Sequence, residues 1–300
     1  MIGWSLPVEG SAEAARLAFF LALLSAVAHA AFGALQKGRH DPWLARGAMD
    51  VFMTAMALPV ALFVAPAPSM ALVAVLAGAF CIHTCYKYVL AMAYTRAAYT
   101  VVYPVVRGIG PLATVLAAGA VFGERFAPLQ WAGVLLLSGA IFALAAYNLR
   151  RTRVGRARLV SALALAIVTG LFVATYTTYD AYGIRLAEHP LTFLAWFFVI
   201  DGLVFPVIAW RRRRRMVDPP ALGPLFLRGV AGALTAFVSF GAVMMATRLD
   251  KVGEAASLRE TSTIFAALFG WLLLREEVGW LRAGLMALVA LGAIAVEFGG

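Results

Sequence analysis

The chain has 300 residues, of which 63% are hydrophobic and only 13% are charged. A soluble domain is about half apolar and about a quarter charged, so this composition predicts an integral membrane protein. The net charge of +10 does not indicate a nucleic-acid partner, because the basic residues cluster in short runs between apolar segments, as in cytoplasmic loops.

Ten apolar segments are long enough to cross a bilayer as helices, which takes about 20 residues. In chain order they are 17–36, 46–65, 70–92, 97–121, 128–147, 159–182, 191–210, 225–246, 250–274 and 279–298. They are longer and more continuous than the alternating strands of about ten residues found in membrane barrels. The first segment is expected to be retained, because residues 1–16 lack the basic region of a signal peptide. We therefore expect an all-α integral membrane protein with ten transmembrane helices.

A basic linker divides these segments into two sets of five that look related. The interval from Arg107 to Arg259 is the same as the interval from Glu124 to Glu276. The matching order predicts two five-helix repeats and a linker, with the boundaries 1–148, 149–158 and 159–300. Five helices per repeat make the repeats inverted, an arrangement in which transporters place the solute site between the repeats near the midplane.

The orientation follows from the short loops richest in Lys and Arg, which stay in the cytoplasm. These loops follow the first, fifth and seventh segments and contain Lys37, Arg39, Arg150–Arg158 and Arg211–Arg215. All three fall on one side of a ten-helix topology. The count therefore predicts cytoplasmic basic loops and both termini outside.

Several short motifs carry a resemblance to a known family. They are Val-Tyr-Pro-Val-Val-Arg-Gly at 102–108, Gly-Glu-Arg at 123–125, Leu-Arg-Glu-Thr-Ser at 258–262 and Leu-Arg-Glu at 274–276. With them, nearly the whole chain resembles the drug/metabolite transporter superfamily, in its ten-helix EamA-type branch. The first and third motifs resemble a narrower group that includes permeases found beside phosphonate-catabolism operons.

The resemblance implies a secondary carrier with alternating access, a multi-pass protein of the bacterial inner membrane that needs no cofactor. It leaves the substrate open, since the superfamily moves amino acids, drugs, sugars, nucleotide sugars and lipid-linked groups. It also leaves the orientation open, because many relatives are described with cytoplasmic termini. Its partners would be a small-molecule solute and membrane lipid, with a second copy of the chain in a homodimer as a further candidate.

Charged residues inside two apolar segments are the main candidates for solute binding. Placing a charge at the bilayer centre costs roughly 2.5–3.5 kcal/mol even on lenient insertion scales. An arginine offers a planar fork of donors to a carboxylate or phosphonate, and a glutamate can take an ammonium group or a proton. At helical spacing these charges share faces with hydroxyl-bearing residues. The candidate set in these two segments is Tyr99, Tyr103, Arg107, Arg259, Glu260 and Thr263.

An alternative for these charges is an internal ion pair, in which Glu260 binds one arginine and only locks the halves together. Further candidates lie outside the two segments. Tyr176 and Asp180 share a face of a polar run in the sixth segment, although Asp180 could instead be solvated near the helix end. For proton coupling the candidates are Glu260, Asp180, Asp201 and His29.

Other polar residues are expected to have structural roles. Lys87 shares a face with His83 and is expected to reach water by snorkelling from the helix end. Cys81 and Cys85 are expected to be buried small side chains, and no metal site is predicted.

The leading hypothesis is a secondary transporter of a small organic anion or zwitterion, such as an amino acid or an aminophosphonate-like metabolite. An exporter of cationic amphiphilic compounds, with Glu260 as the main contact, is the alternative, and a flippase for lipid-linked groups is a further one. An enzyme would need a nucleophile with a base, or metal ligands at helical spacing, and neither constellation is visible. We therefore expect no catalytic residues.

Overall fold

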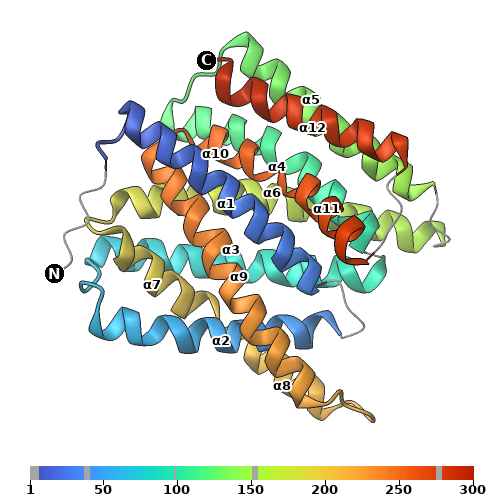
Figure 1. Cartoon of the computed structure of the whole chain (residues 1–300). Coiled ribbons are helices and arrows are strands. Elements are labelled where there is room, and N and C mark those ends of the chain that lie inside the picture. The colour runs from blue at the N-terminus through green and yellow to red at the C-terminus, as the bar shows by residue number, and fades with distance from the viewer. Residues whose placement is uncertain (1–6, 37–40, 98, 151–154, 275–278) are drawn as a thin grey trace.

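Figure 1 shows the computed structural model, which describes residues 7–36, 41–97, 99–150, 155–274 and 279–300. The described residues form α-helices joined by short connections. In chain order the helices are α1 (Ala12–Gln36), α2 (Pro42–Phe63), α3 (Met70–Arg96), α4 (Tyr99–Phe122), α5 (Pro128–Leu149), α6 (Arg156–Leu186), α7 (Pro190–Asp201), α8 (Val204–Arg214), α9 (Leu222–Leu249), α10 (Val252–Arg259), α11 (Ser262–Leu274) and α12 (Trp280–Phe298).

These helices account for the ten expected membrane spans. Nine spans are long and apolar enough to cross a bilayer on their own, counted over the described residues, and one of them is α7 and α8 taken together. The tenth consists of α10 and α11, each too short to span alone. The predicted all-α membrane fold is confirmed. The expectation that the seventh and ninth spans are unbroken helices is wrong.

The seventh span breaks at Gly202, directly after Asp201. A Cβ atom on Gly202 would collide with the side chain of Thr54 and with the backbone carbonyl of Asp50 in α2. Glycine therefore permits a close approach of α2 to the break. The backbone carbonyl of Asp201 accepts a hydrogen bond of 2.5 Å from Nζ of Lys87. The break thus brings a backbone acceptor and a carboxylate to one point inside the protein.

The ninth span breaks between Arg259 and Ser262. Here the backbone N–H groups of Glu260 and Thr261 donate to carbonyls three residues earlier, at 3.1 and 3.0 Å. Such bonds tighten the turn and separate α10 from α11. Arg259 and Glu260 therefore lie at a helix interruption, a feature that builds solute sites near the midplane of transporters.

The packing of the helices follows the two halves. The pair α1 and α9 has its counterpart in α6 and α3, and the pair α4 and α6 has its counterpart in α10–α11 and α1. Equivalent spans also pack on each other, in the pairs α2 with α7–α8, α4 with α10, and α5 with α12. This is the pattern of two inverted five-helix repeats. The boundaries at 148 and 159 stay a prediction, and residues 151–154 of the linker lie outside the described part of the chain.

Glu124 holds the N-terminus of α10. Its carboxylate accepts hydrogen bonds from the backbone N–H groups of Val252 at 2.7 Å and Gly253 at 3.1 Å. A carboxylate at this place satisfies free helix donors and complements the helix dipole. Glu124 therefore has a structural role at this helix terminus, while Glu276, its counterpart in the repeat, lies outside the described residues.

The two cysteines are not buried. Cys81 and Cys85 are exposed on the outer face of α3, so the expectation that they fill the interior is wrong. Any labelling experiment on this protein therefore needs both cysteines replaced by serine.

The orientation can be measured in that cysteine-free background. If the arginine count is right, a cysteine at Val217, in the exposed connection after α8, is cytoplasmic and resists an impermeant thiol reagent in intact cells. A cysteine at Ala67, in the connection between α2 and α3, should react under the same conditions. The reverse pattern would establish cytoplasmic termini.

Candidate functional site

Arg107 and Glu260 form an ion pair between the two halves. Nη1 of Arg107 in α4 lies 2.8 Å from Oε1 of Glu260 at the α10–α11 break, and both side chains are buried. The guanidinium also lies over the ring of Tyr103, with its carbon 5.1 Å from the centroid. The ion pair of Glu260 with one arginine, considered as an alternative from the sequence, is thus present, and the arginine is Arg107. The second carboxylate oxygen of Glu260 is buried without a hydrogen-bond partner among the described residues.

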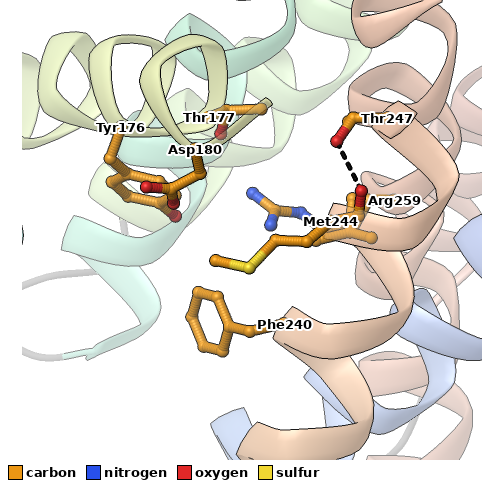
Figure 2. Close-up of a pocket in the computed structure, with 8 residues that line it drawn as sticks. Tyr176, Thr177, Asp180, Phe240, Met244, Thr247 and Arg259 are labelled. Atoms are coloured by element: carbon orange, nitrogen blue, oxygen red, sulfur yellow. Dashed lines mark hydrogen bonds between the residues drawn. The ribbon is translucent and has the colours of Figure 1, made fainter. Parts of the chain in front are cut away.

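Arg259, unlike Arg107, has no ion-pair partner among the described residues. Its side chain is 1% exposed, and no carboxylate of the described residues lies within 4.0 Å of it. Its Nε is buried without a hydrogen-bond partner in the same part of the chain. Figure 2 shows the guanidinium extending from α10 into a small cavity beside Tyr176 and Asp180 of α6. A buried charge with no partner is costly, so this position favours an anion as its counterpart.

Two small cavities flank Tyr176. The one that contains Arg259 is also lined by Asp180, Phe240 and Met244, and it has a volume of about 10 Å³. The one that contains Arg107 is lined by His29 and Tyr103 as well, with a volume of about 30 Å³. About 10–15 Å³ measured in this way holds one water molecule. An organic solute does not fit, so the structure is closed around the two arginines.

A cluster of buried charges lies next to this region, between α2, α3, α6 and α7. Its cationic centre is Lys87, whose Nζ lies 2.9 Å from Oδ2 of Asp50 and 2.8 Å from Oδ2 of Asp201. Arg46 completes this part, with its Nε 2.8 Å from Oδ1 of Asp50 and its Nη2 3.4 Å from Oδ2 of Asp201. We call Arg46, Asp50, His83, Lys87, Asp180 and Asp201 the charge cluster.

His83 joins the two parts of the charge cluster. Its Nε2 lies 2.8 Å from Oδ2 of Asp180, and its Nδ1 lies 3.8 Å from Oδ1 of Asp201. The ring packs against Tyr176, with centroids 4.6 Å apart, and edge-on against Phe197 at 4.8 Å. Asp180 therefore contacts His83 through Oδ2 and also lines the cavity of Arg259. Figure 2 shows the side chains of Asp180 and Arg259 at this cavity.

The charge cluster corrects several expectations. Lys87 does not snorkel to water; it is 4% exposed and paired with two aspartates. Asp180 is not solvated at a helix end, because it is 3% exposed and bonded to His83. Sequence reasoning also missed Arg46 and Asp50. The signal was available, since an arginine and an aspartate four residues apart in an apolar segment predict a pair on one helix face.

Burial bears out a general expectation for the intramembrane charges. Arg107, Arg259, Glu260 and Asp201 are between 1% and 7% exposed, so all four face the interior of the protein rather than lipid. Asp201, whose partner was not evident from the sequence, is bound by Lys87, Arg46 and His83. The cost of charges in hydrocarbon is thus avoided by mutual pairing, except at Arg259.

The remaining candidates are placed as follows. His29 of α1 lines the cavity of Arg107, and its Nδ1 lies 3.1 Å from the hydroxyl of Ser239 in α9. Thr263 donates its hydroxyl to the backbone carbonyl of Glu260 at 2.9 Å, which supports the break rather than the cavity. Tyr99 begins α4, and its side chain lies outside the described part of the structure.

Comparison with known proteins relates the second half of the chain to a family. Residues 160–298 match the model of the EamA-like transporter family. A protein known from a crystal structure has the same fold, with a TM-score of 0.74 and 17% sequence identity over 96% of this chain and 99% of that one. At this identity the likeness establishes the fold alone. A search of curated proteins finds no match to the sequence.

Proposed function

Since residues 160–298 form an EamA-like transporter family domain, we propose that the chain is a secondary transporter that moves a small organic anion or zwitterion by alternating access. The family indicates a multi-pass membrane transporter, or permease, rather than an enzyme. An amino acid or an aminophosphonate-like metabolite is the substrate class that we favour. The proposed location is the bacterial inner membrane.

The observation that carries this proposal is the buried guanidinium of Arg259, which has no carboxylate within 4.0 Å among the described residues. Its planar fork can donate two parallel hydrogen bonds to a carboxylate or a phosphonate, which would supply the missing counter-charge. Tyr176 separates the Arg259 cavity from the Arg107 cavity and is the natural side chain to move when the two cavities join. In this arrangement Arg259 anchors the anion, and the free oxygen of Glu260 receives an ammonium group if the solute has one.

The closed state of the site supports alternating access. The cavities admit water but no organic solute, so the solute must enter through a conformation in which the helices around them have moved apart. The interrupted spans α7–α8 and α10–α11 lie next to the charges and supply places where short helix segments can shift. We propose Glu260, Asp180, Asp201 and His29 as groups for proton coupling, and a homodimer as the assembly.

The alternative of a cation exporter finds less support. Glu260 would be its main contact, yet one of its oxygens is already bound to Arg107, and the nearest free charge in the region is the cation of Arg259. The charge of Arg107 is cancelled by Glu260, so the guanidinium of Arg259 is the group that repels a cationic amphiphile and attracts an anionic or zwitterionic solute.

The experiment is uptake of labelled solutes by liposomes that contain the purified protein. The panel should include alanine, 2-aminoethylphosphonate, propionate, methylphosphonate and a quaternary ammonium dye, with protein-free liposomes as the control. We expect saturable uptake of at least one anion or zwitterion and none of the dye. Saturable uptake of the dye alone would overturn the proposed substrate class.

A further inference from the structure

We propose that His83 and Asp180 together bind one exchangeable proton, and that a solute with one net negative charge enters the site along with this proton. The proposal rests on the proposed transport function and names its coupling ion and the net charge of its substrate. His83 was not among the candidates for proton coupling derived from the sequence. Three features support the proposal: the net charge of the charge cluster, the position of the imidazole of His83 between two carboxylates, and the position of Asp180 between His83 and Arg259.

The charge cluster is not neutral without an added proton. Lys87 and Arg46 supply two positive charges, whereas Asp50, Asp180 and Asp201 supply three negative ones. With a neutral imidazole at His83 the cluster therefore carries one net negative charge. The exposed fraction of its side chains is 14% at Arg46 and 5% or less at the others. A net charge in such a site is unfavourable, and it is compensated either by Arg259 across the cavity or by a single added proton.

The imidazole of His83 is placed to hold that proton. Each of its ring nitrogens faces a carboxylate oxygen: Nε2 faces Asp180 at 2.8 Å and Nδ1 faces Asp201 at 3.8 Å. A neutral imidazole donates from one nitrogen only, and its other nitrogen would then turn a lone pair toward a carboxylate. The doubly protonated ring has a donor on both sides. The ring is therefore placed to accept a second proton, with Asp180 in hydrogen-bond range of Nε2 and the charge of Asp201 near Nδ1.

The surroundings of His83 isolate this proton from water. Tyr176 of α6 and Phe197 of α7 cover the ring, and Tyr86 on its own helix lies edge-on to it. The charged groups that face it are Asp180 from α6, Asp201 from α7, Asp50 and Arg46 from α2, Lys87 from α3 and, across the cavity, Arg259 from α10. The ring itself is 3% exposed, so its proton exchanges through the cavity beside Asp180 rather than directly with bulk water.

Asp180 links the proton to the solute. Its Oδ2 accepts from His83, whereas its Oδ1 is buried without a hydrogen-bond partner among the described residues, and the carboxylate lines the same cavity as Arg259. When the N–H bond at Nε2 of His83 breaks and the proton passes to water, a neutral imidazole remains. Asp180 can then turn to Arg259 and neutralise it. No electrons are transferred in this step.

When the charge of Arg259 is added to that of the charge cluster, the site has one neutral state without a solute and one with a bound monoanion. One has no solute and no proton on the His83–Asp180 pair, with Asp180 compensating Arg259. The other has a monoanion on Arg259 and a proton on the pair. Arg107 and Glu260 cancel in both states. An anion therefore favours proton uptake, and by linkage the proton favours anion binding to the same degree. A zwitterion, with no net charge, brings no proton.

A measurement without solute tests the link between His83 and Arg259. The protein is labelled with ¹⁵N-histidine, placed in lipid nanodiscs and titrated by NMR, and the His83 signal among the four histidines is assigned with His83→Gln. Removing the cation by Arg259→Ala imitates its neutralisation by an anion. We expect the pH of half-protonation of His83 to rise by about one unit, and to fall by at least as much in Asp180→Asn.

Lys251→Ala is the matched control, because it removes an exposed cation at the other end of α10. It should leave the His83 titration unchanged. A titration that responds equally to Lys251→Ala and Arg259→Ala, or to neither, would overturn the proposal. So would a titration that is unaffected by Asp180→Asn.

Proton uptake on solute addition tests the coupling itself. In weakly buffered solution with a pH indicator, propionate, which is a monoanion at neutral pH, should bind with uptake of about one proton, and alanine with none. His83→Gln should bind propionate more weakly than the wild type does and without proton uptake. Binding to wild type without any proton uptake would overturn this inference and leave the transport function intact. A lack of binding by every solute in the panel would instead contradict the transport function, and the NMR titration would still decide whether His83 and Arg259 are coupled.

Discussion

Replacing Arg259 with alanine is expected to abolish solute binding while leaving the folded protein at least as stable as the wild type. No carboxylate of the described residues lies within 4.0 Å of the guanidinium, and a proton taken up by the His83–Asp180 pair can replace its charge, so its removal leaves no uncompensated anion behind. Two hydrogen bonds to a charged group contribute about 1.5 kcal/mol or more each, so the loss should be about 100-fold or more in affinity. Arg259→Lys keeps the charge but loses the fork, and we expect an intermediate loss of about tenfold.

Arg107→Ala is the matched comparison, since it removes a buried arginine from the same region. Here Glu260 loses its partner and becomes an uncompensated buried charge, a change that costs about 3–5 kcal/mol. We expect a clear fall in thermal stability and folded yield, which Glu260→Gln added to Arg107→Ala should partly restore. Solute binding and thermal unfolding in detergent check both residues. Normal affinity in Arg259→Ala would end the assignment of Arg259 as the anchor.

The second large effect is expected at Lys87. Lys87→Met keeps most of the side-chain volume but removes the cation that Asp50 and Asp201 share, together with the donor to the Asp201 carbonyl. Among the described residues, Asp50 then keeps Arg46 as its cationic partner, and Asp201 keeps Arg46 at 3.4 Å and His83 at 3.8 Å. We expect a destabilisation of about 3–5 kcal/mol, measured as a loss of folded yield in size-exclusion chromatography and of thermal stability.

Lys251→Met provides the control for this second prediction. Lys251 also binds a carboxylate, with Nζ 2.7 Å from Glu254, but its side chain is 38% exposed. Exposed pairs contribute about 0–1 kcal/mol, so this variant should fold almost normally. If the two lysine variants lose the same stability, the charge cluster does not hold α2, α3 and α7 together.

The sequence was sufficient for the number and places of the membrane spans, because an apolar run of about 20 residues has few other solutions. It did not predict the breaks at Gly202 and between Arg259 and Ser262. Both depend on contacts with other parts of the fold: Gly202 on the approach of α2, and Arg259 and Glu260 on α4. The helix propensity of a segment depends on its own residues and not on such contacts, so it could not predict the breaks.

Part of the candidate site could be predicted from the sequence. A charge in an apolar segment indicates a polar function inside the membrane, so Arg107, Arg259 and Glu260 could be selected. Which arginine pairs with Glu260 is a matter of distance between helices, and the sequence left it open. The charge cluster was missed for a different reason: Lys87 was expected to reach water, and Asp50 was not considered, although Arg46 lies on the same helix face as Asp50.

The attachment of α10 has a consequence for how the protein moves. This helix has eight residues. Its N-terminus is bound by Glu124, just after α4, and its C-terminal end by the pair that Glu260 makes with Arg107 of α4. It is thus fastened at both ends to the other half of the chain. We expect α10 to travel with α4 as one rigid piece, while α11 follows the remainder of its own half. The hinge of the transport cycle would then be the turn at Glu260 and Thr261, inside a span rather than between spans.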